Sequence, residues 1–161
     1  MWNHRLIAAL ALAASGSTVA CGSSSEDPGT GNTGEPAAGE CSTPGEFDAY
    51  SAGMAKTGDE GIDVAITSAT PAPPVQGDNE WTLMVTDADG APVTGATLEI
   101  VPWMVVHKHG TPVTPRITEG SDGEYTATRV NFVMAGVWET TIRVTTADGV
   151  TDEVMFPFCI E

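Results

Sequence analysis

Positive charge, histidine and cysteine are all scarce in this 161-residue sequence. It contains 6 lysine and arginine residues, 3 histidines and 3 cysteines, against 22 aspartate and glutamate residues. The formal net charge of −16 argues against a nucleic-acid partner, because a protein that binds phosphate backbones needs a basic face. An acidic surface also concentrates cations, but we interpret the acidity first as a property that favours solubility.

Familiar catalytic motifs are missing as well. The sequence contains neither a G-x-S-x-G nucleophile elbow nor an H-E-x-x-H zinc motif. Serine and aspartate are common, but no spacing assembles a Ser-His-Asp set. We therefore expect a protein that is not an enzyme.

The N-terminus has the pattern of an export signal. A short basic opening, Met1–Arg5, precedes an apolar run and a stretch of small residues. The apolar run is too short for a permanent transmembrane helix, which needs about 20 residues. We expect residues 1–20 to be a signal peptide.

Cys21 follows Ala20 directly, and the sequence Thr18-Val19-Ala20-Cys21 resembles a bacterial lipobox. In lipoproteins this cysteine becomes the lipidated first residue of the mature chain, although Thr18 stands where leucine is usual. The resemblance, with Gly22 next in the chain, implies a lipid-anchored protein of the cell envelope, exported to the outer membrane. The alternative is ordinary secretion, with Cys21 as a free or paired thiol.

Composition divides the remainder of the chain into three parts. Residues 21–40 are rich in Gly, Ser and Pro and almost free of apolar side chains, so we expect a flexible tether. Residues 41–60 form an N-terminal extension in this interpretation, and residues 61–161 form one folded domain.

Two cysteines, Cys41 and Cys159, remain if Cys21 carries the lipid. They lack C-x-x-C spacing, and an exported compartment permits disulfides, so we expect them to pair rather than to bind a metal.

Alternating apolar and polar residues predict short strands from about Gly61 onward. Ile62, Val64 and Ile66 share one face of the first predicted strand, and turn signals such as D-A-D-G and S-D-G-E separate those that follow. This pattern, without a long helix, predicts an all-β sandwich. By strand parity, Trp81 and Trp138 belong to the core, whereas Trp103 belongs to a rim.

The stretch W-M-V-V-H-K-H-G contains His107 and His109. On an extended strand these two imidazoles would point to the same face and could chelate one ion together. Met104 has the wrong parity for a straight strand, so its participation requires a kink, and Met134 is the fourth candidate ligand. Thioether sulfur is a soft ligand, so the set favours copper over zinc, with Cu(I) preferred.

The motif P-W-M-x-x-H-x-H-G, a D-G-x-Y turn and an M-x-G-x-W segment together resemble the YtkA-like and FixH-like domain family. The resemblance covers residues 61–158 and implies an immunoglobulin-like β-sandwich of about seven antiparallel strands. It also implies a role in copper handling and assigns Met104, His107, His109 and Met134 to the family's Met/His positions. Val105 and Lys108 depart from the pattern, which often has proline and glycine there.

Two functions remain open from the sequence. The first is an envelope lipoprotein that binds copper without catalysis and holds it or delivers it to a copper-accepting protein. The second is a scaffold or protein-interaction module on the outer membrane, in which the two methionines pack in the sandwich and the histidines end a loop.

Overall fold

The computed structural model describes Cys41 and residues 47–161. By its contacts the chain divides into Met1–Thr33 and Gly34–Glu161, and the described residues all belong to the second unit. The expected signal peptide, the whole tether of residues 21–40 and the lipidation site Cys21 lie outside the described residues.

The described residues form nine strands and no helix, so this part of the chain contains no helix that could cross a membrane. The strands are β1 (Met54–Thr57), β2 (Asp63–Thr70), β3 (Gly77–Thr86), β4 (Thr97–Met104), β5 (His109–Gly110), β6 (Arg116–Glu119), β7 (Glu124–Phe132), β8 (Gly136–Thr145) and β9 (Thr151–Ile160).

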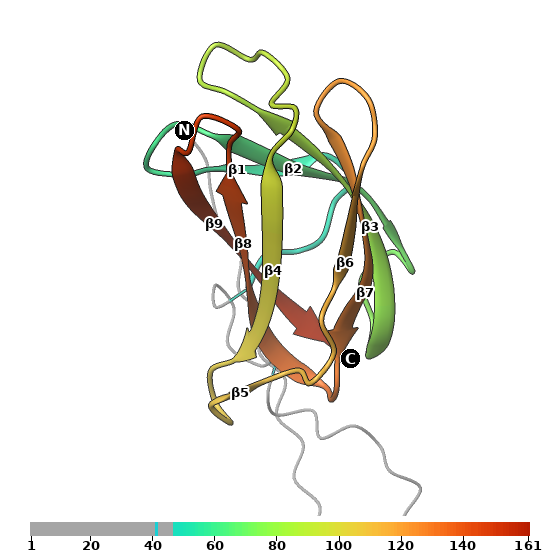
Figure 1. The fold of residues 1–161 in the computed structure, drawn as a ribbon. Helices are drawn as coiled ribbons and strands as arrows, with labels where there is room; N and C mark the ends of the chain where they lie inside the picture. Colours follow the sequence, from blue (N-terminus) through green and yellow to red (C-terminus); the bar gives the residue numbers. More distant parts are fainter. Residues whose placement is uncertain (1–40, 42–46) are drawn as a thin grey trace, which may run out of the picture. The chain divides into compact units, whose positions relative to one another are not determined.

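The strands build two sheets, with the orders β1-β2-β3-β7-β6 and β5-β4-β8-β9 (Figure 1). Every neighbouring pair is antiparallel, which confirms the predicted all-β sandwich. The first strand, β1, precedes Gly61, so the sheet begins within the segment that we expected to be an extension.

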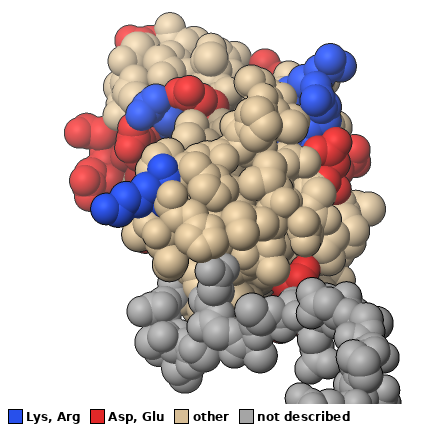
Figure 2. Space-filling model, turned by 90° about the horizontal axis from the view of Figure 1, so that it is seen from below, with Lys and Arg blue, Asp and Glu red and all other residues tan. Residues whose placement is uncertain are grey.

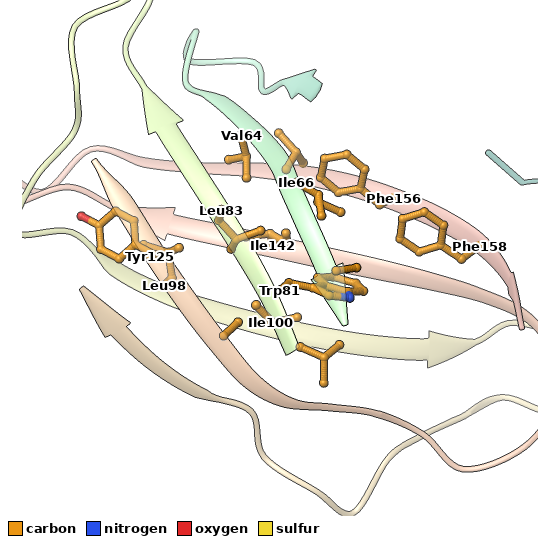
Figure 3. Close-up of a cluster of buried hydrophobic side chains, with 14 of the residues drawn as sticks. Val64, Ile66, Trp81, Leu83, Leu98, Ile100, Tyr125, Ile142, Phe156 and Phe158 are labelled. Carbon is orange, nitrogen blue, oxygen red and sulfur yellow. The ribbon is translucent and has the colours of Figure 1, made fainter. Parts of the chain in front are cut away.

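The core lies between the sheets and follows the predicted alternation. Ile62, Val64 and Ile66 are buried, as are Trp81 and Trp138. Figure 3 shows side chains from both sheets meeting in this layer. Trp103, by contrast, is 42% exposed, in agreement with its predicted place at a rim.

The long strands run from one end of the sandwich to the other, so the loops gather at two ends. Loops 71–76, 105–108 and 133–135 lie at the end where β9 finishes (Figure 1). We call it the metal-centre end because it carries the predicted ligands. The pairings Gly77↔Phe132 and Gly136↔Ile160 place the termini of four strands there. Loops 58–62, 87–96, 120–123 and 146–150 lie at the opposite end.

A disulfide attaches the N-terminal side of the domain to its last strand. Cys41 and Cys159 are bonded, with their Cα atoms 5.6 Å apart. Cys159 pairs with Val137 near the start of β8, so the bond lies at the metal-centre end.

Candidate metal centre

The candidate ligands on the first loop are arranged by a hairpin between β4 and β5. Met104 ends β4, His109 begins β5, and the two are paired across the ladder. Residues 105–108 form the turn, in which the Lys108 N–H donates to the Met104 carbonyl at 2.8 Å. Lys108 adopts a left-handed backbone conformation with φ 55°.

This hairpin changes the geometry expected for an extended strand. His107 lies in the turn rather than one strand step from His109 on a common face. Residues directly opposite each other in an antiparallel pair point to the same side of the sheet, so the hairpin places Met104 on the face of His109. On a straight strand Met104 would face the side opposite to His109, but the chain reversal brings both residues to the same side.

Three of the four predicted ligands come together at the surface. The Nδ1 atom of His107 lies 3.4 Å from the sulfur of Met134, which belongs to the β7–β8 loop. The rings of His107 and His109 have centroids 5.9 Å apart. His107 is exposed, whereas His109 and Met134 are half-buried.

Met104 occupies a different environment from the other three. Its exposed fraction is 0%, and it belongs to the hydrophobic core cluster. The pairing with His109 places it on the inner side of the candidate centre. Its sulfur is thus separated from solvent, whereas Met134 packs against the core from the surface.

The hydrogen bonding of His109 determines which ring nitrogen is available. Its Nδ1 atom lies 2.9 Å from the carbonyl oxygen of Gly110. A carbonyl can only accept, so Nδ1 carries a proton, and in the neutral imidazole the lone pair is then on Nε2. Histidine ligands in metal sites almost always have this arrangement, in which the second nitrogen donates to a carbonyl or a carboxylate.

Trp138 holds both sides of the centre in place. Its indole N–H donates to the Met134 carbonyl at 3.0 Å, and its ring contacts the His109 ring edge-on, with centroids 5.6 Å apart. Sequence parity predicted only that Trp138 would be in the core. The M-x-G-x-W spacing was the available signal for its second role, because the bend at residues 134–135 brings the tryptophan on β8 back to Met134.

The donor set is soft. No group of three or more His, Cys, Asp or Glu side chains that could hold a metal ion occurs among the described residues. A metal bound here would therefore rely on two imidazoles and thioether sulfur, which suit Cu(I) better than harder ions. Lys108, between the histidines in sequence, adds one positive charge at the surface.

Comparison with known proteins identifies one sequence family. The model of the family described as YtkA-like matches residues 56–143, which is more than half of the chain. The match extends from β1 into β8 and includes all four candidate ligands. No curated protein matches the chain.

Two solved structures are similar to the chain at 13% sequence identity. A DUF4426 family protein from Pseudomonas aeruginosa has a TM-score of 0.46, over 66% of this chain and 96% of that one. A copper-bound variant of FetP from uropathogenic Escherichia coli has a TM-score of 0.44, over 71% of this chain and 98% of that one. At this identity the likeness concerns the fold and carries no information about a site.

Proposed function

The chain belongs to the YtkA-like family, and we propose that it is a non-catalytic envelope lipoprotein that binds Cu(I) and holds or delivers it. In this proposal His107, His109 and Met134 are the ligands, and Met104 forms the inner wall of the site. The lipid on Cys21 anchors the protein in the outer membrane, where a copper-accepting protein takes the ion.

The observation that carries the proposal is the hydrogen bond from His109 Nδ1 to the Gly110 carbonyl. It fixes the tautomer and the orientation of the ring before a metal arrives, so less freedom is lost on binding.

The short approach between His107 Nδ1 and the Met134 sulfur supports the same conclusion. At 3.4 Å, both atoms could reach one ion after a small movement. A nitrogen and a thioether sulfur at one point on the surface favour a soft monovalent ion. Because Met104 is fully buried, we expect it to contribute less to affinity than Met134.

Anaerobic titration with Cu(I), in competition with a chromogenic chelator, tests the proposal. We expect stoichiometric binding by the wild type and its loss in the double variant His107→Ala/His109→Ala. Met134→Ala should weaken binding, whereas Met155→Ala should not, because Met155 is an exposed methionine on β9 outside the centre. Affinity should also decrease as the pH is lowered, because a metal binds the neutral imidazole.

Failure of the wild type to compete for Cu(I), with Cu(II) and Zn(II) also unbound, would contradict the proposal. The protein would then be better described as a β-sandwich scaffold or interaction module without a metal. Equal weakening by Met134→Ala and Met155→Ala would contradict the assignment of Met134 as a ligand.

A further inference from the structure

The metal-centre end carries most of the exposed apolar side chains in the described part of the chain. Eight large hydrophobic residues are exposed among the described residues, and five of them lie at or beside this end. These five are Val75, Trp103, Val105, Val106 and Val133. Val106, at the tip of the β4–β5 turn, is the most exposed, at 63%. Several exposed apolar side chains at one end of a domain make that end a candidate contact surface.

Charge is distributed very unevenly between the two ends. Loops 71–76, 105–108 and 133–135 contain no acidic residue and one cation, Lys108. The loops of the opposite end contain no cation and six acidic residues: Asp59, Glu60, Asp87, Asp89, Asp122 and Asp148. Figure 2 looks at the metal-centre end and shows a broad uncharged area with charged side chains mostly toward its margins.

Acidic groups do occur beside the neutral loops, but they do not interrupt them. Asp48 forms an ion pair with Lys56 at 2.8 Å, the exposed Asp78 near the start of β3 accepts a hydrogen bond from the Asn131 side chain at 2.6 Å, and Glu161 follows the end of β9. The domain is therefore polarised, with an acidic end and an apolar end that also holds the candidate ligands.

The attachment point of the tether lies at the apolar end. The Cys41–Cys159 disulfide fixes Cys41 beside the end of β9. The proposed lipid anchor, Cys21, precedes Cys41 by 20 residues. A chain of 20 residues spans at most about 70 Å when fully extended. The chain from the proposed anchor therefore joins the domain at this end.

From these three observations we propose that the metal-centre end lies against the phospholipid surface and presents the copper site to the membrane. The inference rests on the lipid anchor in the proposed function. Val105, Val106 and Trp103 contact the interfacial region, where tryptophan is favoured because its ring is amphipathic. The acidic end points away, because an anionic membrane surface repels it.

A second copy of the chain is the main competitor for the same surface. Two copies would meet more readily through their neutral ends than through their acidic ends, which repel each other. The tether favours the membrane instead, because it joins the domain at this end and would have to leave between two opposed copies.

Fluorescence quenching in vesicles tests the orientation. The lipidated, processed protein is reconstituted in phosphatidylethanolamine/phosphatidylglycerol vesicles that contain a headgroup nitroxide lipid. We expect loss of tryptophan emission from the wild type but not from Trp103→Phe, because Trp81 and Trp138 are fully buried. The matched control adds Val150→Trp to Trp103→Phe. It places an exposed tryptophan at the acidic end, where we expect no quenching.

Val106→Asp should reduce the quenching of Trp103, and its unfolding midpoint should confirm that the domain is folded. Protein that floats with the vesicles without quenching of Trp103, or with equal quenching at position 150, would overturn this inference alone. If the protein does not float with the vesicles, it has no working lipid anchor. That result would overturn both this inference and the proposed location. A dimer that Val106→Asp dissociates, without quenching in the wild type, would assign the surface to a second copy. Cu(I) titration of the same samples reports separately on the metal site.

Discussion

At the scale of single residues, Tyr125 connects β7 to the long β3–β4 loop. Its hydroxyl donates to the Val93 carbonyl at 2.9 Å and accepts from the Ala96 N–H at 3.1 Å. The side chain is fully buried, and burial raises the pKa of the phenol above its ordinary value. The folded protein therefore keeps this proton at a pH where the unfolded chain has begun to lose it.

Tyr125→Phe should lower the free energy of unfolding by about 1–2 kcal/mol near pH 7, because two partly buried backbone groups lose their partner. Wild-type stability should be retained below about pH 10 and should fall as the pH rises further, since the neutral phenol is favoured by the fold. The free energy of unfolding of Tyr125→Phe should decrease less at alkaline pH than that of the wild type. Urea unfolding at several pH values measures both effects.

Tyr50→Phe provides a control, because Tyr50 is only partly buried beside the core. An alkaline loss of the same size in wild type and Tyr125→Phe would show that another group is responsible. An unchanged stability near pH 7 would show that water replaces the hydroxyl at both backbone groups.

At the scale of elements, the β4–β5 hairpin determines the form of the candidate centre. Its turn requires a left-handed residue at Lys108, and a lysine side chain is unfavourable there. The related family often has glycine at this position, which adopts positive φ without strain. The lysine therefore reduces the stability of the hairpin and adds a repulsive charge beside the proposed cation site.

Lys108→Gly should stabilise the protein by roughly 0.5–1 kcal/mol. Glycine adopts positive φ without strain, and this gain is larger than the cost of its greater conformational freedom in the unfolded chain. Lys108→Ala removes the same charge but retains the strain, so it should not stabilise. Both variants should bind Cu(I) slightly more tightly than wild type, as measured by chelator competition. If only Lys108→Gly gained affinity, the turn conformation rather than the charge would control the site.

Strand alternation was sufficient to predict much of the fold but not the shape of the centre. Trp81 and Val64 are inward because side chains alternate with a period of two, and that rule holds wherever the backbone stays extended. It fails after Met104, where the chain reverses within four residues. The approach of Met134 to His107 connects the β4–β5 turn with the β7–β8 loop across 27 residues, and no local pattern encodes such a distance. The position of Met134 at a strand end and its thioether chemistry made it a candidate, and the family resemblance assigned it to the same set.

At the scale of the whole molecule, the disulfide closes nearly the entire described chain into one loop. Cys41 and Cys159 are separated by 118 residues. In the chain-entropy description, a loop of this length contributes up to about 5 kcal/mol by restricting the unfolded state. The β-sandwich itself has a continuous core, so we expect it to remain folded without the bond.

The double variant Cys41→Ser/Cys159→Ser should therefore unfold at a lower urea concentration, with a loss of about 2–5 kcal/mol. Reduction of the wild type with dithiothreitol should give the same loss, whereas dithiothreitol should not affect the double variant. Cu(I) binding should persist, since neither cysteine is a proposed ligand. Loss of binding on substitution would show that the bond also positions the β7–β8 loop.

The same bond determines how the domain responds to mechanical force. A pull on the chain before Cys41 passes through the disulfide to Cys159 and bypasses β1, which is held to β2 by four residue pairs. The load falls on β9, which is paired with β8 over ten residues. Directed along β9, it shears these ten pairs together rather than separating them one at a time. When an anchored domain is joined in this way, its longest strand pairing, rather than its weakest, bears the force transmitted through the tether.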